Sequence, residues 1–261
     1  MTNATLEMIL ARRSLRAYLE TPLSQSEKDT IFEAAMRAPT AGNMMLYSII
    51  EVEDQALKEK LVQTCDNQPF IARSSFVLIF LADYQRWMDF FDYCGAEARC
   101  IELDGQPRKP QEGDFLLACA DALIAAQTAA LAAESLGIGS CYIGDIKENY
   151  ETHREMFNLP PYVFPAAMLC FGYPRPVKAP HRRTPRYDRE FIIHHDSYQR
   201  VKPADMERMA APINSHYFAS GKYFTGAENL GQHFYLKKFT AEFSREMSRS
   251  VRAALRNWSE E

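Results

Sequence analysis

Residues 113–144 read GDFLLACADALIAAQTAALAAESLGIGSCYIG, and this stretch decides the fold. Between Phe115 and Leu136 almost every residue is a good helix former, and the many alanines let a neighbouring backbone approach closely. The segment therefore predicts one long helix that is buried on most of its faces. Gly137 stands where a helix favours a left-handed cap, and a short strand is predicted from residue 140.

Two other interpretations of this stretch were weighed. The helix is long enough to span a bilayer, but Asp121 and Glu134 lie inside it and no other segment of the chain is comparable. The glycines after it resemble a dinucleotide fingerprint, yet that motif needs a strand before the glycines and a helix after them. We therefore expect neither a membrane span nor a dinucleotide site here.

The composition is that of a globular chain. With 47% hydrophobic and 25% charged residues, the 261-residue protein is neither disordered nor fibrous, and it is long enough for one domain with an appendage. Its net charge of -4 provides no overall positive field, so nucleic acid is not an expected partner.

The six cysteines are scattered and form no CxxC pair. The N-terminus begins with an amphipathic helical pattern and not with the apolar segment of a signal peptide. We therefore expect free thiols in a reducing cytoplasm and neither a disulfide framework nor a metal site.

Helices and strands follow from the periodicity of the apolar residues. Predicted helices cover residues 4–11, 24–37, 55–64, 115–136, 150–157 and 235–258, and predicted strands cover residues 46–52, 76–81, 141–146 and 163–172. A polar linker is expected between residues 203 and 235. The last helix, with its aromatic stripe, suits either the core of its own chain or the surface of a partner subunit.

Arginine is concentrated at two places. Residues 12–16 read RRSLR, and residues 182–186 read RRTPR among several prolines. Guanidinium groups match phosphate oxygens in a bidentate geometry, so either cluster suits an anion. Cations near a helix end also complement the helix dipole without binding a ligand, so the residue pattern alone leaves both interpretations open.

Two further segments hold candidate site residues. The turn APTAGN at residues 38–43 is rich in small residues that let backbone N–H groups approach a ligand, although it also suits an ordinary helix-to-strand turn. Residues 83–112 combine charged side chains with aromatic ones such as Trp87. This excursion forms either a lid over a site or a surface insertion.

Four motifs in a fixed order carry a resemblance to a known family. They are ARRSLRAY at residues 11–18, APTAGN at 38–43, AAESLGIGSCYIG at 132–144 and LPPYVFPAAMLCFGYP at 159–174. Together they resemble the FMN-dependent nitroreductase family, nearest its oxygen-insensitive, NADPH-preferring branch. The resemblance implies an α+β, nitroreductase-like fold with a central, mostly antiparallel sheet flanked by helices, in an intertwined homodimer with two FMN sites at its interface.

The resemblance also implies which residues would bind FMN. Those for the phosphate are Arg12, Arg13, Ser14 and Arg16, joined by Arg183 and Arg186. Those that would approach the flavin from the partner chain are Thr40 and Asn43, and Met45, two residues further on, is also a candidate cofactor-binding residue. Those that would line the isoalloxazine ring are Gln68, Pro69, Phe70, Tyr142, Ile143 and Gly144.

Two positions depart from the family pattern. Met45 stands where the family commonly has a glutamine, which puts a hydrogen bond at the ring edge in doubt. Thr184 stands where the compared branch often has a lysine, for which Arg183 is the nearest substitute. No catalytic side chain is assigned, because the flavin would supply the redox chemistry.

The implied activity is hydride transfer from NADPH or NADH, through FMN, to a nitroaromatic, a quinone or a similar small acceptor, with ping-pong kinetics. The alternatives are an NAD(P)H:flavin reductase, a specialised reductive role such as dehalogenation, and a flavin-binding protein without turnover. Residues 1–202 are expected to form the FMN-binding domain. Residues 203–261 are expected to form a C-terminal helical extension that packs on the dimer.

Overall fold

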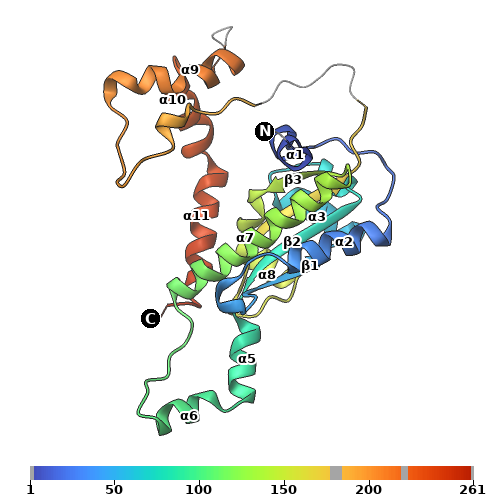
Figure 1. Cartoon of the computed structure of the whole chain (residues 1–261), viewed down its shortest axis with the longest axis vertical. Helices are drawn as coiled ribbons and strands as arrows, with labels where there is room; N and C mark the ends of the chain where they lie inside the picture. Colours follow the sequence, from blue (N-terminus) through green and yellow to red (C-terminus); the bar gives the residue numbers. More distant parts are fainter. Residues whose placement is uncertain (1–2, 177–183, 219–222, 260–261) are drawn as a thin grey trace. The chain divides into compact units, whose positions relative to one another are not determined.

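The structure, a computed structural model, describes residues 3–176, 184–218 and 223–259 (Figure 1). The chain divides into two compact units, one made of residues 1–178 and 246–261 and the other of residues 179–245. The larger unit contains the sheet. The predicted domain boundary after residue 202 stays a prediction.

The sheet has four strands in the order β1-β2-β4-β3, and all three pairings are antiparallel. The strands are β1 (Tyr47–Glu51), β2 (Phe76–Asp83), β3 (Gly139–Ile143) and β4 (Val163–Gly172). Every residue of the two central strands, β2 and β4, is buried, as their apolar runs predict. The expected α+β fold with an antiparallel sheet is confirmed. β3 is an edge strand, and it ends at Ile143, earlier than predicted, because a 3₁₀ turn (Gly144–Lys147) follows it.

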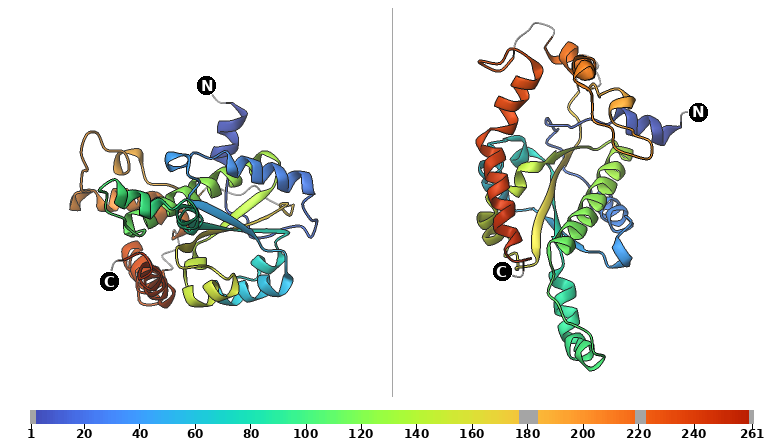
Figure 2. Two further views of the ribbon diagram at one scale, coloured as in Figure 1. Left: turned by 90° about the horizontal axis from the view of Figure 1, so that it is seen from below. Right: turned by 90° about the vertical axis from the view of Figure 1, so that its left-hand side faces the viewer.

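Helices cover both faces of the sheet (Figure 2). One face is covered by α2 (Gln25–Met36) and α7 (Glu112–Ser135), and the other by α3 (Gln55–Thr64), α4 (Phe70–Arg73) and α8 (Tyr150–Met156). A short helix, α1 (Ala4–Ala11), precedes them. α2 begins where the sequence predicts, because Ser24 and Glu27 form a capping box.

The long helix α7 is buried on one side only. Seven of its alanines between residues 118 and 133 pack into the core, whereas Leu116, Leu117, Leu123 and Ile124 are exposed, Leu116 by 67%. The prediction of burial on most faces is therefore wrong for the single chain. Among the described residues, α7 is the one helix whose length and composition would suit a membrane span.

The C-terminal helix is shorter than predicted and ends in the core of its own chain. A π-helical turn (Tyr235–Phe239) precedes α11 (Glu242–Leu255), so the predicted helix is broken near Thr240. Trp258 is fully buried, and its ring meets that of Phe115 edge to face at 5.3 Å. The sequence left open whether this helix covers the core of its own chain or the surface of a partner subunit. Its C-terminal end covers the core of its own chain.

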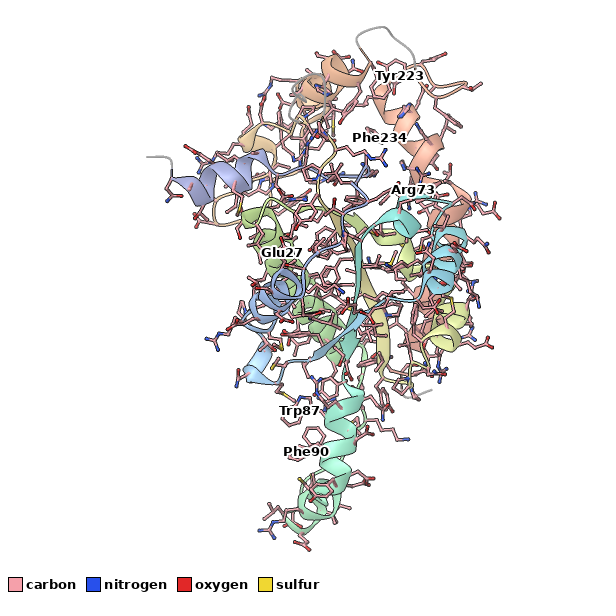
Figure 3. The ribbon with its side chains drawn as sticks, turned by 90° about the vertical axis from the view of Figure 1, so that its right-hand side faces the viewer. Glu27, Arg73, Trp87, Phe90, Tyr223 and Phe234 are labelled. Atoms are coloured by element: carbon pink, nitrogen blue, oxygen red, sulfur yellow. The ribbon has the colours of Figure 1, made fainter. Side chains whose placement is uncertain are left out.

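Residues 83–112 form two helices, α5 (Gln85–Tyr93) and α6 (Ala96–Glu102). Figure 3 shows Trp87 and Phe90 along α5, beyond the end of the sheet. Phe90 and Tyr93 are exposed. Within the single chain, this excursion extends away from the sheet.

The second unit contains α9 (Met206–Tyr217) and α10 (Leu230–Phe234). The expectation of a polar linker between residues 203 and 235 is therefore wrong. Aromatic side chains hold this unit together: the ring of Phe218 stacks on that of Tyr223 at 4.9 Å and lies 4.5 Å from that of His233. Its aromatic cluster is thus built from rings that lie within 15 residues of one another in the sequence.

Candidate functional site

The N-terminal arginines lie on a segment that runs beside the edge strand β3. We call residues 12–18 the arginine arm. The arm pairs with the beginning of β3, where Ser14 forms a parallel bridge with Ser140 and the Leu15 amide donates to the Ser140 carbonyl at 2.9 Å. The arm is therefore held at the edge of the sheet by backbone pairing.

A buried tyrosine and two glycines set how closely the arm approaches the sheet. The hydroxyl of Tyr18 lies 2.6 Å from the Leu15 carbonyl oxygen and 3.1 Å from that of Cys170. A Cβ at Gly139 would stand 2.5 Å from a Leu15 methyl carbon, and one at Gly172 would stand 2.7 Å from the Tyr18 ring. Side chains at these two positions would push the arm off the sheet.

The arginines of the arm have unused hydrogen-bonding capacity. The Nη1 atom of Arg12 is buried and has no hydrogen-bond partner in the described part of the chain. Burial raises the pKa of the Glu134 carboxyl, and Arg12 and Arg13 oppose that rise. Burial likewise raises the pKa of the Cys141 thiol, opposed by Arg16. An unpaired buried guanidinium N–H is costly, so an anion bound here would satisfy it.

A second segment, the loop of residues 40–46, is built around Asp121 of α7. The Asp121 side chain is 2% exposed, and it accepts hydrogen bonds from the Thr40 hydroxyl, from the Ala41 amide at 3.0 Å and from the Leu46 amide at 3.1 Å. A buried carboxylate is stable when several donors surround it. The one acidic residue in the middle of the apolar helix thus shapes this loop.

The same loop has an unusual backbone. Gly42, Asn43 and Met45 have φ angles of 55°, 58° and 51°, in the left-handed region that favours glycine. The Trp87 indole N–H, on α5, donates to the Met44 carbonyl of this loop at 2.7 Å. These contacts fix the loop and leave the Asn43 side chain exposed.

The arm and the loop meet α7 at different ends. Asp121 contacts the loop and Glu134 faces the arm; they are 13 residues apart, or about 20 Å at 1.5 Å per residue. Within one chain, the structure therefore does not bring Thr40 and Asn43 to the arginine arm.

The residues around Gln68 do lie beside β3. The Gln68 side-chain amide donates to the Asp145 carboxylate at 2.7 Å, and Asp145 directly follows Gly144. The ring of Phe70 lies 6.4 Å from that of Tyr18 in the arm. The arm, the end of β3 and the Gln68 loop thus form one continuous region, the candidate site.

At the end of β3, this site is bordered by one side chain, that of Tyr142, and by backbone groups of Ile143 and Gly144. The Tyr142 hydroxyl donates to Gln127 at 3.3 Å, and burial raises its pKa to about 12, with Arg12 opposing the rise. Ile143 is buried in the core, so only its backbone is available to a ligand. Gly144 faces open space, and Pro69 is exposed.

The second arginine cluster is only partly described. Arg183 lies outside the described residues. Arg186 belongs to the second unit, where its Nη1 donates to the carbonyls of Thr184 at 3.3 Å and Pro185 at 3.1 Å. It lines a cavity of about 610 Å³ together with Tyr217, Phe218, Lys237 and Lys238.

The model of the Nitroreductase family matches residues 9–173. The chain belongs to the nitroreductase family. The match begins in α1 and ends just after β4, so the arm, the loop of residues 40–46, the Gln68 loop and all four strands of this nitroreductase lie inside it.

Individual relatives agree with that assignment. The chain is 30% identical to an "Oxygen-insensitive NADPH nitroreductase" of Salmonella typhimurium, over 83% of this chain and 84% of that protein. It is 32% identical to an "FMN reductase [NAD(P)H]" of Bacillus subtilis, over 75% of each chain. Among solved structures, B. megaterium NfrA2 superposes with a TM-score of 0.78 at 27% identity, over 98% of each chain.

Sequence reasoning missed two acidic residues that position the loops of this nitroreductase, Asp121 and Asp145. Asp121 carried a signal, because a carboxylate in the middle of an apolar helix needs a partner. Asp145 carried none, because acidic residues in a polar turn are common. Their roles depend on partners more than 70 residues away, Leu46 for Asp121 and Gln68 for Asp145.

Proposed function

We propose that this chain is an FMN-dependent oxidoreductase that takes a hydride from NADPH or NADH and reduces small acceptors such as nitroaromatics or quinones. The observation that carries the proposal is the arginine arm, held against an edge strand with the buried Nη1 atom of Arg12 unpaired. The names of the Salmonella and Bacillus relatives, an NADPH nitroreductase and an FMN reductase, support the same chemistry.

The residues of the arm suit the phosphate of FMN. A phosphate monoester carries about -1.5 to -2 charges near neutral pH and three strong acceptor oxygens. Arg12, Arg13 and Arg16 supply guanidinium donors, and the exposed Ser14 supplies a hydroxyl. We infer that these four residues hold the phosphate, whereas the contribution of Arg186 depends on the placement of the second unit.

The end of β3 and the Gln68 loop suit the flat ring. An edge strand presents backbone N–H and C=O groups that no neighbouring strand uses, and Gly144 leaves open space in front of its backbone. Gln68, Pro69 and Phe70 would close the site from the other side, with Phe70 supplying an aromatic face.

The chain's own residues would bind and orient the cofactor. When bound, FMN supplies the transfer of hydride and electrons. A tyrosine hydroxyl is protonated near neutral pH, and that of Tyr142 donates its hydrogen to Gln127 at 3.3 Å, which holds the side chain beside the site. The positive charge of Arg16 would favour negative charge on a bound ligand. Donor and acceptor would use the same site in turn, which predicts ping-pong kinetics.

We further propose a homodimer. α7 exposes Leu116, Leu117, Leu123 and Ile124, and α1 exposes Leu6, Ile9 and Leu10, which makes two apolar surfaces for a second copy to cover. A second copy would also bring Thr40 and Asn43 to the arginine arm, which within one chain faces α7 at Glu134, about 20 Å along the helix from Asp121. Light scattering should give a mass of two chains. A monomer that retains FMN would contradict this assembly.

The first test is the absorbance spectrum of the purified protein, followed by anaerobic addition of NADPH and then NADH. Stoichiometric FMN that bleaches with one of the two nucleotides supports the proposal and identifies the donor. A colourless protein that takes up no FMN refutes it. A flavin that stays oxidised with both nucleotides supports a binding protein without turnover.

A flavin reductase is the second candidate, favoured by the 32% identity to an FMN reductase. Steady-state turnover with free FMN and with a nitroaromatic separates the two functions. A flavin reductase should have the higher kcat/KM with free FMN, and a nitroreductase with the nitroaromatic.

The phosphate assignment predicts the effect of Arg12→Ala. Loss of one charge-assisted hydrogen bond, about 1.5–3 kcal/mol, should weaken FMN binding about 10- to 100-fold. Arg252→Ala, an exposed arginine on α11, is the matched control and should leave the Kd unchanged. Unaltered FMN affinity in the Arg12 variant would contradict the phosphate assignment. The arginines of the arm would then be solvated residues at a helix end.

A further inference from the structure

The side chain of Gln68 is held at one end by two acceptors. Its Nε2 group donates to the Asp145 carboxylate at 2.7 Å and to the Cys65 carbonyl at 3.0 Å. A carbonyl oxygen cannot donate, so the end of the amide that faces these two partners must be its NH₂ group. Both hydrogens of that group are used within the protein. The amide oxygen, Oε1, is therefore the end that remains for a ligand.

The backbone before and after Gln68 is fixed. Cys65 is fully buried, and its amide donates to the Leu61 carbonyl at 2.9 Å at the end of α3. The backbone carbonyl of Gln68 itself accepts from the amide of Ile71 at 3.1 Å, and Ile71 is fully buried. The Gln68 side chain thus starts from a fixed backbone and lies against a fixed carbonyl.

Asp145 is held by the turn after β3. Its backbone carbonyl accepts from the Glu148 amide at 3.0 Å, and the neighbouring Ile146 is fully buried in the core. Further along the turn, the Asn149 side-chain amide donates to the Thr64 carbonyl at 2.9 Å, which ties the turn to the end of α3. Because these contacts do not involve the Asp145 carboxylate, removal of that side chain should leave the turn attached.

The two acceptors decide which end of the amide faces the site. A carboxamide has two ends of similar shape, one that donates and one that accepts, and an unheld glutamine samples both orientations and several rotamers. In the reversed orientation, Oε1 would face the Asp145 carboxylate and the Cys65 carbonyl, and these contacts between acceptors are repulsive. Asp145 therefore stabilises one orientation of Gln68 and excludes the other.

The exposed acceptor selects the donating edge of a ligand. Among the residues that the structure describes, none donates a hydrogen bond to Oε1 of Gln68. Asp145 directly follows Gly144, in front of which there is open space at the end of β3. The isoalloxazine ring of oxidised flavin has a single N–H group, at N3, and its other edge heteroatoms are acceptors. Oε1 is thus suited to this N–H group.

We propose that Asp145 is a positioning residue for flavin binding: it accepts the Gln68 amide N–H and so keeps the Gln68 oxygen available as an acceptor for an N–H group of the ring. The inference rests on the proposed function, since Gln68 is expected to line the flavin ring. It adds a residue that acts through Gln68 and not by contact with the cofactor.

The size of the effect follows from the cost of ordering a side chain. A glutamine that is already held loses little freedom when the ligand binds, whereas a released one must be immobilised at that moment. Asp145→Ala should therefore raise the Kd of FMN about 3- to 10-fold, which corresponds to about 0.7–1.4 kcal/mol. Asp145→Asn keeps an acceptor oxygen for the amide, so its Kd should stay within about twofold of wild type.

The test is the Kd of FMN, from quenching of flavin fluorescence, in wild type and in both Asp145 variants, each alone and combined with Gln68→Ala. Gln68→Ala alone should weaken binding at least as much as Asp145→Ala does. Once Gln68 is alanine, Asp145→Ala should have no further effect, because the two residues act as one unit. A residue that only stabilised the turn would weaken binding equally in both backgrounds.

Asp29 on α2 provides a matched control. It also accepts a hydrogen bond from a glutamine side chain, that of Gln25, at 2.8 Å, but it is exposed and lies on a helix that covers the other face of the sheet. Asp29→Ala removes the same kind of contact away from the Gln68 loop. This variant should leave the Kd of FMN unchanged.

Four results would overturn the inference. They are wild-type affinity in Asp145→Ala, an Asp145→Asn variant as weak as Asp145→Ala, a full loss that persists when Gln68 is alanine, and an equal loss in the Asp29 control. An Asp145→Ala chain that does not fold would overturn it as well, because Asp145 would then hold the turn itself. Absence of FMN binding by wild type would instead refute the proposed function.

Discussion

Replacement of Asp121 by alanine should destabilise the protein more than any exposed substitution on α7. Three donors point at its buried carboxylate: the Thr40 hydroxyl and the amides of Ala41 and Leu46. In the Asp121→Ala variant these donors lose their acceptor, and each unsatisfied buried donor costs about 1–3 kcal/mol.

Two effects reduce the summed cost of these three unsatisfied donors. Thr40 and Ala41 are only half-buried, so water can reach part of the loop, and alanine has a higher helix propensity by a few tenths of a kcal/mol. The expected net loss is about 3–5 kcal/mol. For a chain of this size, 1 kcal/mol corresponds to roughly 2–4 °C in Tm, so we expect a fall of roughly 10 °C.

Differential scanning calorimetry of the purified protein measures this change. Glu112→Ala, an exposed acidic residue in the first turn of the same helix, is the matched control, and its Tm should fall by no more than about 3 °C. A change in the Asp121 variant as small as that of the control would show that Asp121 does not organise the loop of residues 40–46.

Two further predictions concern the C-terminal helix. Trp258→Ala should cost about 3–5 kcal/mol in the free energy of unfolding, measured by urea denaturation, because this ring is fully buried against Phe115; a loss below 1 kcal/mol would show that the helix end is not part of the core. Glu246→Gln should cost about 1 kcal/mol at neutral pH, because hydrogen bonds from Arg249 and Ser250 lower the pKa of Glu246 to about 2. A lowered pKa stabilises the fold above the ordinary value near 4.5, so the difference from wild type should close as the pH falls from 5 towards 2; a difference that is constant with pH would contradict the assignment.

Sequence patterns were sufficient for the elements whose cause is local. α3 spans Gln55–Thr64 as predicted, because its apolar spacing and its Asp54 cap are both contained within a few residues. β2 and β4 followed from continuous apolar runs, which are typical of strands buried on both faces. α9 was missed because the polar stretch that contains it carries Pro212 and no continuous apolar stripe.

The candidate site likewise has a part that the sequence predicted and a part that it did not. Four ordered motifs led from the sequence to the arginine arm, the Gln68 loop and the end of β3, and the structure brings these three together. The motifs do not reveal that, within one chain, the loop containing Thr40 and the arm meet α7 at two points about 20 Å apart along the helix. That separation follows from where α7 carries Asp121 and Glu134.

By itself, the sequence determined the fold class, the long alanine-rich helix and the family, because hydrophobic periodicity and short motifs are properties of neighbouring residues. Only the tertiary structure decided that Asp121 shapes a loop 75 to 81 residues before it, that Arg12 has an unpaired buried nitrogen and that Asp145 holds the side chain of Gln68. Each of these depends on burial and on partners brought together across the sheet. A hydrogen bond or a pKa is set by what surrounds a group in space, and the order of residues along the chain does not contain that information until the chain has folded.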